Sequence, residues 1–292
     1  MDCVTQYRDA LQSVFGPLDW LPEPDGSIHR FRVLGDKPGT LNGWYLLFAD
    51  GIASGCFGSW KVGTSHTWSS RQPADPKEAD LLRQRIEQAR RQREAEQHQR
   101  QQDAAEYANR LWRDARRADP DHPYLSAKAI RAYALRQRGD VLLVPLTYAG
   151  QLVNLQRIHP DGTKRFLFGG MVKGCYSPLG IIQPGKPLCI CEGWATAATL
   201  HTETGAAVVS ALNAGNLLPV ALGLRAKHPG LEIIIAGDDD RLTPGNPGRT
   251  AAHAAAVAVG GQVVFPEWPA AAPDSLTDFN DLVAWSNAHG IA

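Results

Sequence analysis

Three carboxylates stand where apolar strands should end. Glu192 follows the run "KPLCIC", and Asp238 and Asp240 follow "LEIIIAG", 46 residues further along the chain. Because side chains alternate along extended backbone, we expect Asp238 and Asp240 to share one face, with Asp239 turned away. If the two strands are neighbours, three like charges meet at one edge and raise each other's pKa values. Since carboxylate oxygens are ligands for Mg²⁺ and Mn²⁺, the spacing predicts a site for one of these cations.

Each acidic segment taken alone has a simpler interpretation. The "DDD" at 238–240 would also suit a solvated turn, and a Glu-Gly pair often caps a helix. The two segments together, in this order on two buried strands, favour a shared site.

The elements that must position these acids alternate regularly from Lys186 onward. Strands are expected in "KPLCICEG", "AAVVSAL", "LEIIIAGDDD" and "QVVFPEW", and helices in the segments between them. Strands without polar alternation are buried on both faces, which predicts an α/β fold with a parallel sheet flanked by helices. Ligands of such sheets bind outside the carboxyl ends of the strands, where the acids lie.

The sequence suggests four segments. Residues 1–72 predict a small β-rich domain, 73–120 a long charged helix or linker, 121–185 a mixed β-rich basic subdomain and 186–292 the α/β domain. The long helix is either a solvated spacer or an element that follows nucleic acid. In the first domain, the rings of Trp44, Phe57, Trp60 and Trp68 are either its core or a platform for unpaired bases.

Charge is balanced overall, with 30 basic and 30 acidic residues, but it is segregated along the chain. Residues 121–175 carry eight Lys or Arg against three Asp, and residues 176–292 carry five against ten acids. This pattern suits a path for a polyanion beside a cation site. Cys189 and Cys191 alternate inside a strand and are expected in the core. The sequence shows no zinc-ligand spacing, signal peptide or membrane-spanning run, so we expect a cytoplasmic protein.

An apolar strand ending in Glu-Gly, then a helix, then a strand ending in Asp-x-Asp, resembles the Toprim domain. That domain is shared by bacterial-type primases, type IA and II topoisomerases and certain nucleases. The resemblance implies that Glu192 acts as a general acid/base or metal ligand and that Asp238 and Asp240 hold Mg²⁺. The segment "VVSALNAGN" is similar to the intervening strand and turn, which implies that Asn213 and Asn216 approach the site.

Two further segments bear on this resemblance. "DFNDL", 278–282, resembles an acidic signature that follows Toprim in plasmid and phage primases. It implies that Asp278 and Asp281 support or orient metal, with Asp281 as an additional ligand. "GRTAA", 248–252, is similar to the small-residue helix of primases, but the inserted "LTPGNP" leaves the preceding turn open.

Residues 140–170, "DVLLVPLTYAGQLVNLQRIHPDGTKRFLFGG", resemble the strands that precede Toprim in bacterial replicative primases. The resemblance implies that Lys164 and Arg165 face template and nucleotide, with Arg157 and Lys173 as nearby phosphate contacts. Segments of the first 70 residues also resemble the amino-terminal region of mobile-element primases. The zinc ribbon of replicative primases has no counterpart here.

These resemblances imply a primase of the plasmid or phage type. Such an enzyme makes short RNA primers from NTPs on single-stranded DNA by metal-dependent nucleotidyl transfer, with a separate replicative helicase as a candidate partner. A Toprim nuclease and a catalytically silent protein that binds single-stranded nucleic acid remain open alternatives. A topoisomerase is disfavoured, because no nucleophilic-Tyr domain is recognisable. The chain also contains no P-loop motif.

Overall fold

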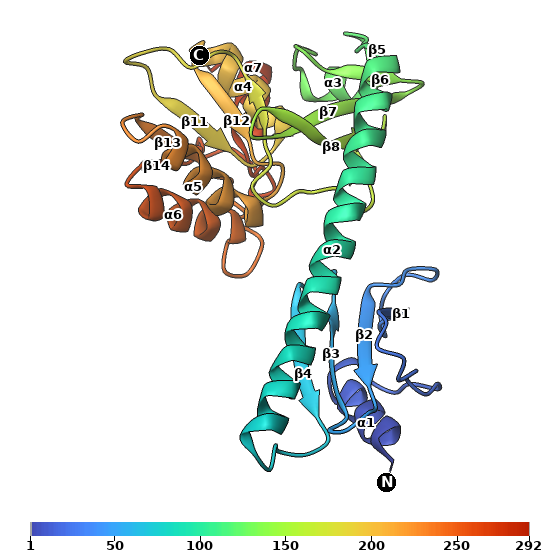
Figure 1. Ribbon diagram of the computed structural model, residues 1–292. Coiled ribbons are helices and arrows are strands. Elements are labelled where there is room, and N and C mark those ends of the chain that lie inside the picture. The colour runs from blue at the N-terminus through green and yellow to red at the C-terminus, as the bar shows by residue number, and fades with distance from the viewer. Residues whose placement is uncertain (1, 292) are drawn as a thin grey trace. The chain divides into compact units, whose positions relative to one another are not determined.

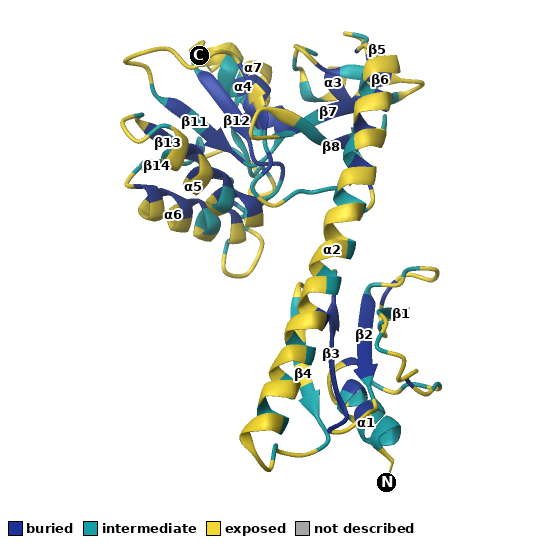
Figure 2. Cartoon of the chain, in the orientation of Figure 1, coloured by how far each residue is buried: buried dark blue, intermediate teal, exposed yellow. Residues whose placement is uncertain are grey.

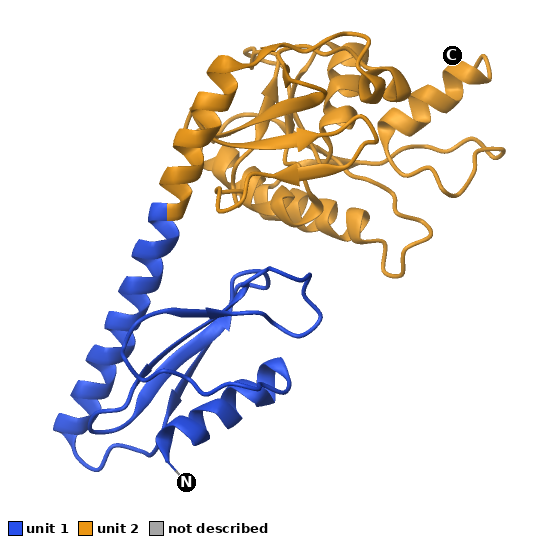
Figure 3. Ribbon diagram, turned by 90° about the vertical axis from the view of Figure 1, so that its right-hand side faces the viewer, with its two compact units in different colours: residues 1–99 blue, residues 100–292 orange. Residues whose placement is uncertain are grey.

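The structure is a computed structural model that describes residues 2–291. The chain forms two compact units, one ending at Gln99 and the other beginning at Arg100 (Figure 3). The boundary falls inside the long helix α2 (Pro76–Asp114), so the helix expected over 73–120 contributes to both units.

The first unit packs one helix, α1 (Cys3–Phe15), against an antiparallel sheet (Figure 1). The strands pair in chain order: β1 (His29–Phe31), β2 (Gly43–Phe48), β3 (Ser54–Ser59) and β4 (Thr64–Ser69). Strands β2 and β3 are almost wholly buried (Figure 2).

The rings of Trp44 and Phe57 lie in the core of this unit, with exposed fractions of 2% and 4%. Phe57 packs with Tyr7 of α1, and Trp44 packs with Ala89 of α2. The core interpretation therefore holds for these two rings, and the contact with Ala89 helps to hold the amino-terminal part of α2 on the sheet. Trp60 is only partly buried.

The second unit begins with an antiparallel sheet whose strands also pair in chain order. They are β5 (Arg116–Arg117), β6 (Arg136–Arg138), β7 (Val141–Tyr148), β8 (Gln151–Ile158) and β9 (Lys164–Phe166), with the short helix α3 (Pro123–Lys128) between β5 and β6. Ala108 and Leu111 of α2 pack on Leu143 and Leu155 of this sheet.

The remaining sheet has the order β10-β12-β11-β13-β14. Its strands are β10 (Ser177–Leu179), β11 (Leu188–Cys191), β12 (Ala207–Ser210), β13 (Ile233–Ala236) and β14 (Gln262–Val264). All neighbours are parallel except β10, which pairs antiparallel with β12. The expected parallel sheet is confirmed, and the antiparallel edge strand is an addition that the sequence did not predict.

Helices cover both faces of this sheet (Figure 1). They are α4 (Trp194–Thr204), the 3₁₀ turn η1 (Ala214–Asn216), α5 (Leu217–Lys227), α6 (Pro247–Val259) and α7 (Phe279–Ala288). The alternation of β11 assigns Ile190 to the core with α5 and α6, and Cys191 to the core with α4. Cys191 is therefore a core residue, as expected.

No helix within residues 2–291 combines the length and apolarity that crossing a bilayer requires.

Tyr7 provides a test of the first unit. Its hydroxyl lies 3.0 Å from the Leu46 carbonyl oxygen and 2.8 Å from that of Cys56, and the side chain is fully buried. Tyr7→Phe leaves both carbonyls without this partner, so it should destabilise the unit by about 1–3 kcal/mol. The expected result is a faster reaction of the buried Cys56 thiol, by roughly 5- to 150-fold, measured by mass spectrometry after alkylation under native conditions. The same change at exposed Tyr107 should leave the rate unaltered; an unchanged rate for Tyr7→Phe would contradict this account.

Candidate active site

The strands that carry the acids are neighbours. Strand β11 pairs in parallel with β13, with Cys191 opposite Ala236. Glu192 follows β11 directly, and Asp238 follows β13 after one glycine. The two carboxylates are therefore presented at the same edge of the sheet, outside the carboxyl ends of its strands.

Backbone contacts with the end of β12 hold Glu192. Its carbonyl oxygen accepts hydrogen bonds from the Leu212 N–H (2.7 Å) and from the Ser210 hydroxyl (2.9 Å). Leu212 adopts a left-handed backbone with φ of 70°, which costs a non-glycine residue about 1–2 kcal/mol. Burial raises the pKa of Glu192, the nearby Asp240 carboxylate raises it further, and the Ala214 N–H counteracts both.

Among the acids of the site, Asp238 has the pKa that is shifted furthest from its ordinary value. Burial, followed by the negative charges of Glu192, Asp278 and Asp240, raises its pKa from 3.8 to about 8, while Lys164 opposes this shift. Its Oδ1 is buried and has no hydrogen-bond partner within the described chain. A buried carboxylate without a partner is costly, so this oxygen is an acceptor left open for a cation or a proton.

Asp239 points away from this group and has a structural role. The residue is 4% exposed, and its carboxylate accepts hydrogen bonds from Asn246 Nδ2 (2.7 Å), Trp268 Nε1 (3.1 Å) and Arg249 (3.2 Å). Three donors therefore satisfy the acid between the two predicted ligands.

Asp240 joins the site to the start of α6. Its Oδ2 accepts the Gly248 N–H at 2.9 Å, and its own N–H donates to Asn246 Oδ1. A Cβ at Gly248 would lie 2.7 Å from the Asp238 carbonyl oxygen, so only glycine allows this approach. Asn246, inside the inserted "LTPGNP" segment, also caps α6 by accepting the Arg249 N–H.

The two acids of "DFNDL" differ in their surroundings. Asp281 accepts hydrogen bonds from Lys128 Nζ (3.0 Å) and the Thr277 N–H (3.1 Å), so its carboxylate is already paired. Asp278 caps α7 by accepting the Asp281 N–H. Burial and then the charge of Asp281 raise the pKa of Asp278, and Asp278 in turn raises the pKa of Asp238. The charge of Asp278, rather than that of Asp281, therefore affects the pKa of the strand-end acid Asp238.

Lys164 reaches this group from the other sheet. The side chain is exposed, yet its Nζ lies 5.5 Å from the centre of the Tyr124 ring, and desolvation followed by the charge of Lys128 lowers its pKa. The acids Asp278, Asp238 and Glu192 counteract that decrease. Lys128, at the end of α3, belongs to the same group, and the sequence offered no signal for it.

The other predicted basic residues lie further along the same sheet. Arg157 on β8 is directly opposite Arg165 on β9, and the Arg157 Nε is buried without a hydrogen-bond partner in the described chain. Arg165 and Lys173 are exposed. None of these three basic residues is among the groups that shift the pKa of Glu192 or Asp238.

The two predicted asparagines also differ. Asn216 is 3% exposed, accepts the Gly174 N–H (2.7 Å) and donates to the carbonyl oxygens of Cys175 and Ala211 (both 2.8 Å). It therefore ties the turn after β12 to the segment before β10. Asn213 is only partly buried and precedes the 3₁₀ turn η1 without capping it.

The donor set fits a divalent cation in its chemistry, because its oxygens are hard ligands and Asp238 Oδ1 lacks a partner. The strand-end acids are nevertheless more widely spaced than a closed coordination shell. Among residues 2–291, three ligand atoms come within 4.8 Å of one another at Glu23, Asp25 and His29 of the first unit, where the two acids are exposed and the histidine is partly buried.

The raised pKa of Asp238 leads to a test on protein kept in EDTA. In the unfolded chain this carboxyl keeps its ordinary pKa, so the folded state holds the proton more tightly and loses stability as the pH rises from 3.8 towards about 8. Asp238→Asn removes that loss, and we expect it to raise the melting temperature by several degrees at pH 8.5 and very little at pH 5.

The neighbouring substitution is the matched control. Asp239→Asn replaces an acid that three donors satisfy, so it should lower the melting temperature. A destabilising effect of Asp238→Asn at pH 8.5 would contradict the assigned burial of an unpaired charge.

Comparison with known proteins shows what the chain is similar to. Residues 187–287 match the family described as a Toprim domain. Two proteins of Escherichia coli named DNA primase TraC are 39% and 37% identical to the chain over 279 residues, which cover 87% and 89% of it. The chain spans only 19% and 26% of the length of these relatives.

A bacteriophage T7 structure of lagging-strand DNA polymerase with primase domains bound to an RNA/DNA hybrid and dTTP also matches. It covers 56% of this chain and 85% of the matched one, at 18% identity and a TM-score of 0.37. Residues 187–287 thus match the Toprim-domain family, and most of the chain is similar in sequence to the TraC primases.

Proposed function

We propose that this chain is a DNA primase that makes short RNA primers from NTPs on single-stranded DNA. The observation that carries the proposal is the Toprim acid group, in which Glu192, Asp238 and Asp240 lie at the ends of paired strands and Asp238 lacks a partner. The similarity to proteins named DNA primase supports the choice of reaction over other uses of the same acids.

The acids would hold Mg²⁺ or Mn²⁺. Asp238 Oδ1 is the open ligand position. Glu192 lies near enough for its negative charge to raise the pKa of Asp238. Asp240 can contribute the carboxylate oxygen that does not bind the Gly248 N–H. A divalent cation bound there supplies Lewis acidity and neutralises the charge of the nucleoside triphosphate.

The reaction joins the primer's 3′ oxygen to the α-phosphorus of an NTP and releases pyrophosphate. Glu192, whose pKa is raised by burial, is suited to accept the proton of the 3′ hydroxyl. Lys164, whose pKa the charges of the same acids raise, would position the triphosphate. Arg157, Arg165 and Lys173 would contact phosphates of the template, which fixes its path without reading its sequence. A separate helicase is a candidate partner that would deliver single-stranded template.

The direct test is primer synthesis on single-stranded DNA with all four NTPs and Mg²⁺ or Mn²⁺. Asp238→Asn should reduce product formation at least about a hundredfold, because the acid group provides several kcal/mol of charge stabilisation. Glu232→Gln is the control, since that acid is exposed and lies just before the amino end of β13, whereas the site lies beyond its carboxyl end. Product is measured as labelled NTP incorporated into short RNA.

Other outcomes identify the alternatives. Degradation of labelled DNA in the absence of NTPs would indicate a nuclease. Retention of intact template in a gel shift, without any product, would indicate a binding protein. Undiminished synthesis by Asp238→Asn would refute the assigned site.

Lys164 allows a second test. Lys164→Met should lower kcat/KM for NTPs by at least about tenfold, since a charge-assisted contact with phosphate contributes roughly 1.5–3 kcal/mol. It should also move the acidic limb of the pH profile to higher pH, because Lys164 lowers the pKa of Asp238 and its removal raises that pKa. Lys227→Met, on α5, is the control. A lower rate with an unchanged pH profile would contradict the placement of the Lys164 ammonium close to Asp238.

A further inference from the structure

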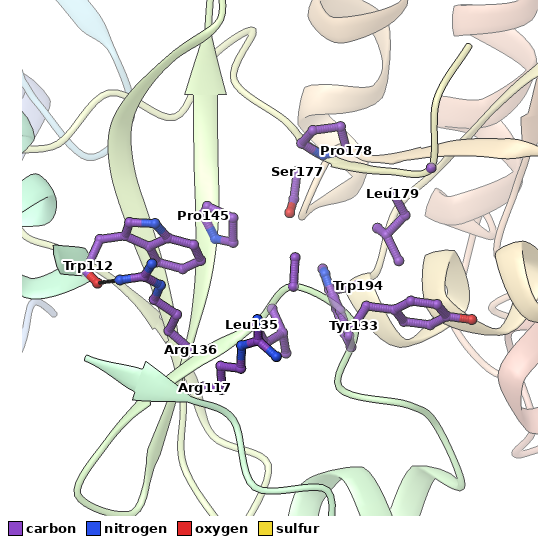
Figure 4. A pocket seen from close by; sticks show the side chains of 12 residues that line it. Trp112, Arg117, Tyr133, Leu135, Arg136, Pro145, Ser177, Pro178, Leu179 and Trp194 are labelled. Atoms are coloured by element: carbon purple, nitrogen blue, oxygen red, sulfur yellow. Dashed lines mark hydrogen bonds between the residues drawn. The ribbon is translucent and has the colours of Figure 1, made fainter. Parts of the chain in front are cut away.

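A pocket of about 580 Å³ opens in the second unit between the β6–β7 region and the β10–α4 region (Figure 4). The indoles of Trp112 and Trp194 stand on opposite sides of it, and Leu135, Pro145 and Leu179 complete an apolar lining. Its volume is typical of small-molecule sites, which measure about 300–1,000 Å³. None of the strand-end acids lines it.

Two buried side chains direct unpaired donors into this pocket. Ser177 and Trp194 are 1% and 2% exposed, and neither the Ser177 hydroxyl nor the Trp194 indole N–H has a hydrogen-bond partner in residues 2–291. Figure 4 shows the oxygen of Ser177 and the indole nitrogen of Trp194 turned towards the pocket. Both donors therefore end at the pocket surface, where acceptor atoms of a ligand can reach them.

The charged residues of the pocket are both arginines. The Arg136 guanidinium lies 5.0 Å from the centre of the Trp112 ring and donates to the Trp112 carbonyl oxygen, so it is held in place. Arg117 is exposed on β5 and forms no ion pair within the described chain. No Asp or Glu lines the pocket. The site is therefore cationic, and it is rich in donors and poor in acceptors.

We infer that this pocket binds a nucleoside phosphate. The base packs beside the partly exposed Trp112 indole and accepts hydrogen bonds from Ser177 and Trp194, while the phosphate pairs with Arg117 and Arg136. Inorganic phosphate would leave most of the volume and both indoles unused, and an apolar ligand would leave the arginines and donors unpaired. The ligand is either a free nucleotide or a nucleotide unit of a single strand. The inference does not depend on the proposed primase activity.

Titration calorimetry in EDTA, which keeps metal-dependent binding at the acids out of the measurement, tests this site. The probes are ATP, inorganic tripolyphosphate and a short oligothymidylate. Arg117→Ala should weaken nucleotide binding at least about tenfold, since it removes a charge-assisted contact with phosphate. Arg116→Ala is the matched control, because Arg116 is the adjacent exposed arginine of the same strand and does not line the pocket. It should change binding less than about twofold, as a screened surface charge does.

Ser177→Ala tests the contact with the base separately. It should weaken ATP without affecting tripolyphosphate, and it removes only one oxygen from a small side chain. Asp238→Asn should leave ATP binding in EDTA unchanged, so the result stands whether or not the acids catalyse primer synthesis.

The outcomes separate the sources of the ligand. ATP binding that depends on Arg117 indicates a free nucleotide, and Arg117-dependent binding of the oligonucleotide alone indicates a strand. Equal affinity of ATP and tripolyphosphate would overturn the nucleoside assignment. Absence of binding, or equal effects of Arg117→Ala and Arg116→Ala, would overturn the site.

Discussion

The repulsion among buried carboxylates at the end of a parallel strand pair is the constraint on which the second unit depends. The pairing of β11 with β13 fixes Glu192 and Asp238 at one edge, and burial raises the pKa of both. A fold tolerates such a group only if the surrounding backbone determines its position. Here the ends of β12 and β13 provide that support, through hydrogen bonds to the Glu192 carbonyl and between Asp240 and the start of α6.

The opposing positive charge comes from a different sheet. Lys164 is on β9, and Lys128 ends α3, so both depend on the attachment of the antiparallel sheet to the Toprim sheet. That attachment includes the backbone hydrogen bonds between Thr147 and Tyr176, and Asn216 fixes the adjoining residues Gly174 and Cys175. A basic surface and an acidic strand edge thus become one site because buried polar groups fasten the two sheets together.

The sequence predicted the parts of this arrangement that arise from local pattern. Uninterrupted apolar runs predicted the buried parallel strands, and the two-residue spacing of Asp238 and Asp240 predicted that Asp239 diverges, as the structure places it. The antiparallel strand β10 was missed because three residues carry too little periodicity. Lys128 could not be found, because its neighbours Asp278 and Asp281 lie about 150 residues away in sequence. The same distance concealed that Lys128 pairs with Asp281 and leaves Asp278 beside Asp238.

The turn that begins α4 connects the acid group to the pocket. Glu192 belongs to the strand edge, while Trp194, two residues later, forms one wall of the pocket. The intervening Gly193 precedes α4 without a side-chain cap, so the turn is held by the bonds that Leu212 and Ser210 donate to the Glu192 carbonyl. Any ligand that accepts a hydrogen bond from the Trp194 indole therefore contacts a residue only two positions from the acid. Because Glu192 follows the end of β11 and Trp194 already begins α4, one short turn serves both the charged edge of the sheet and the apolar wall of the pocket.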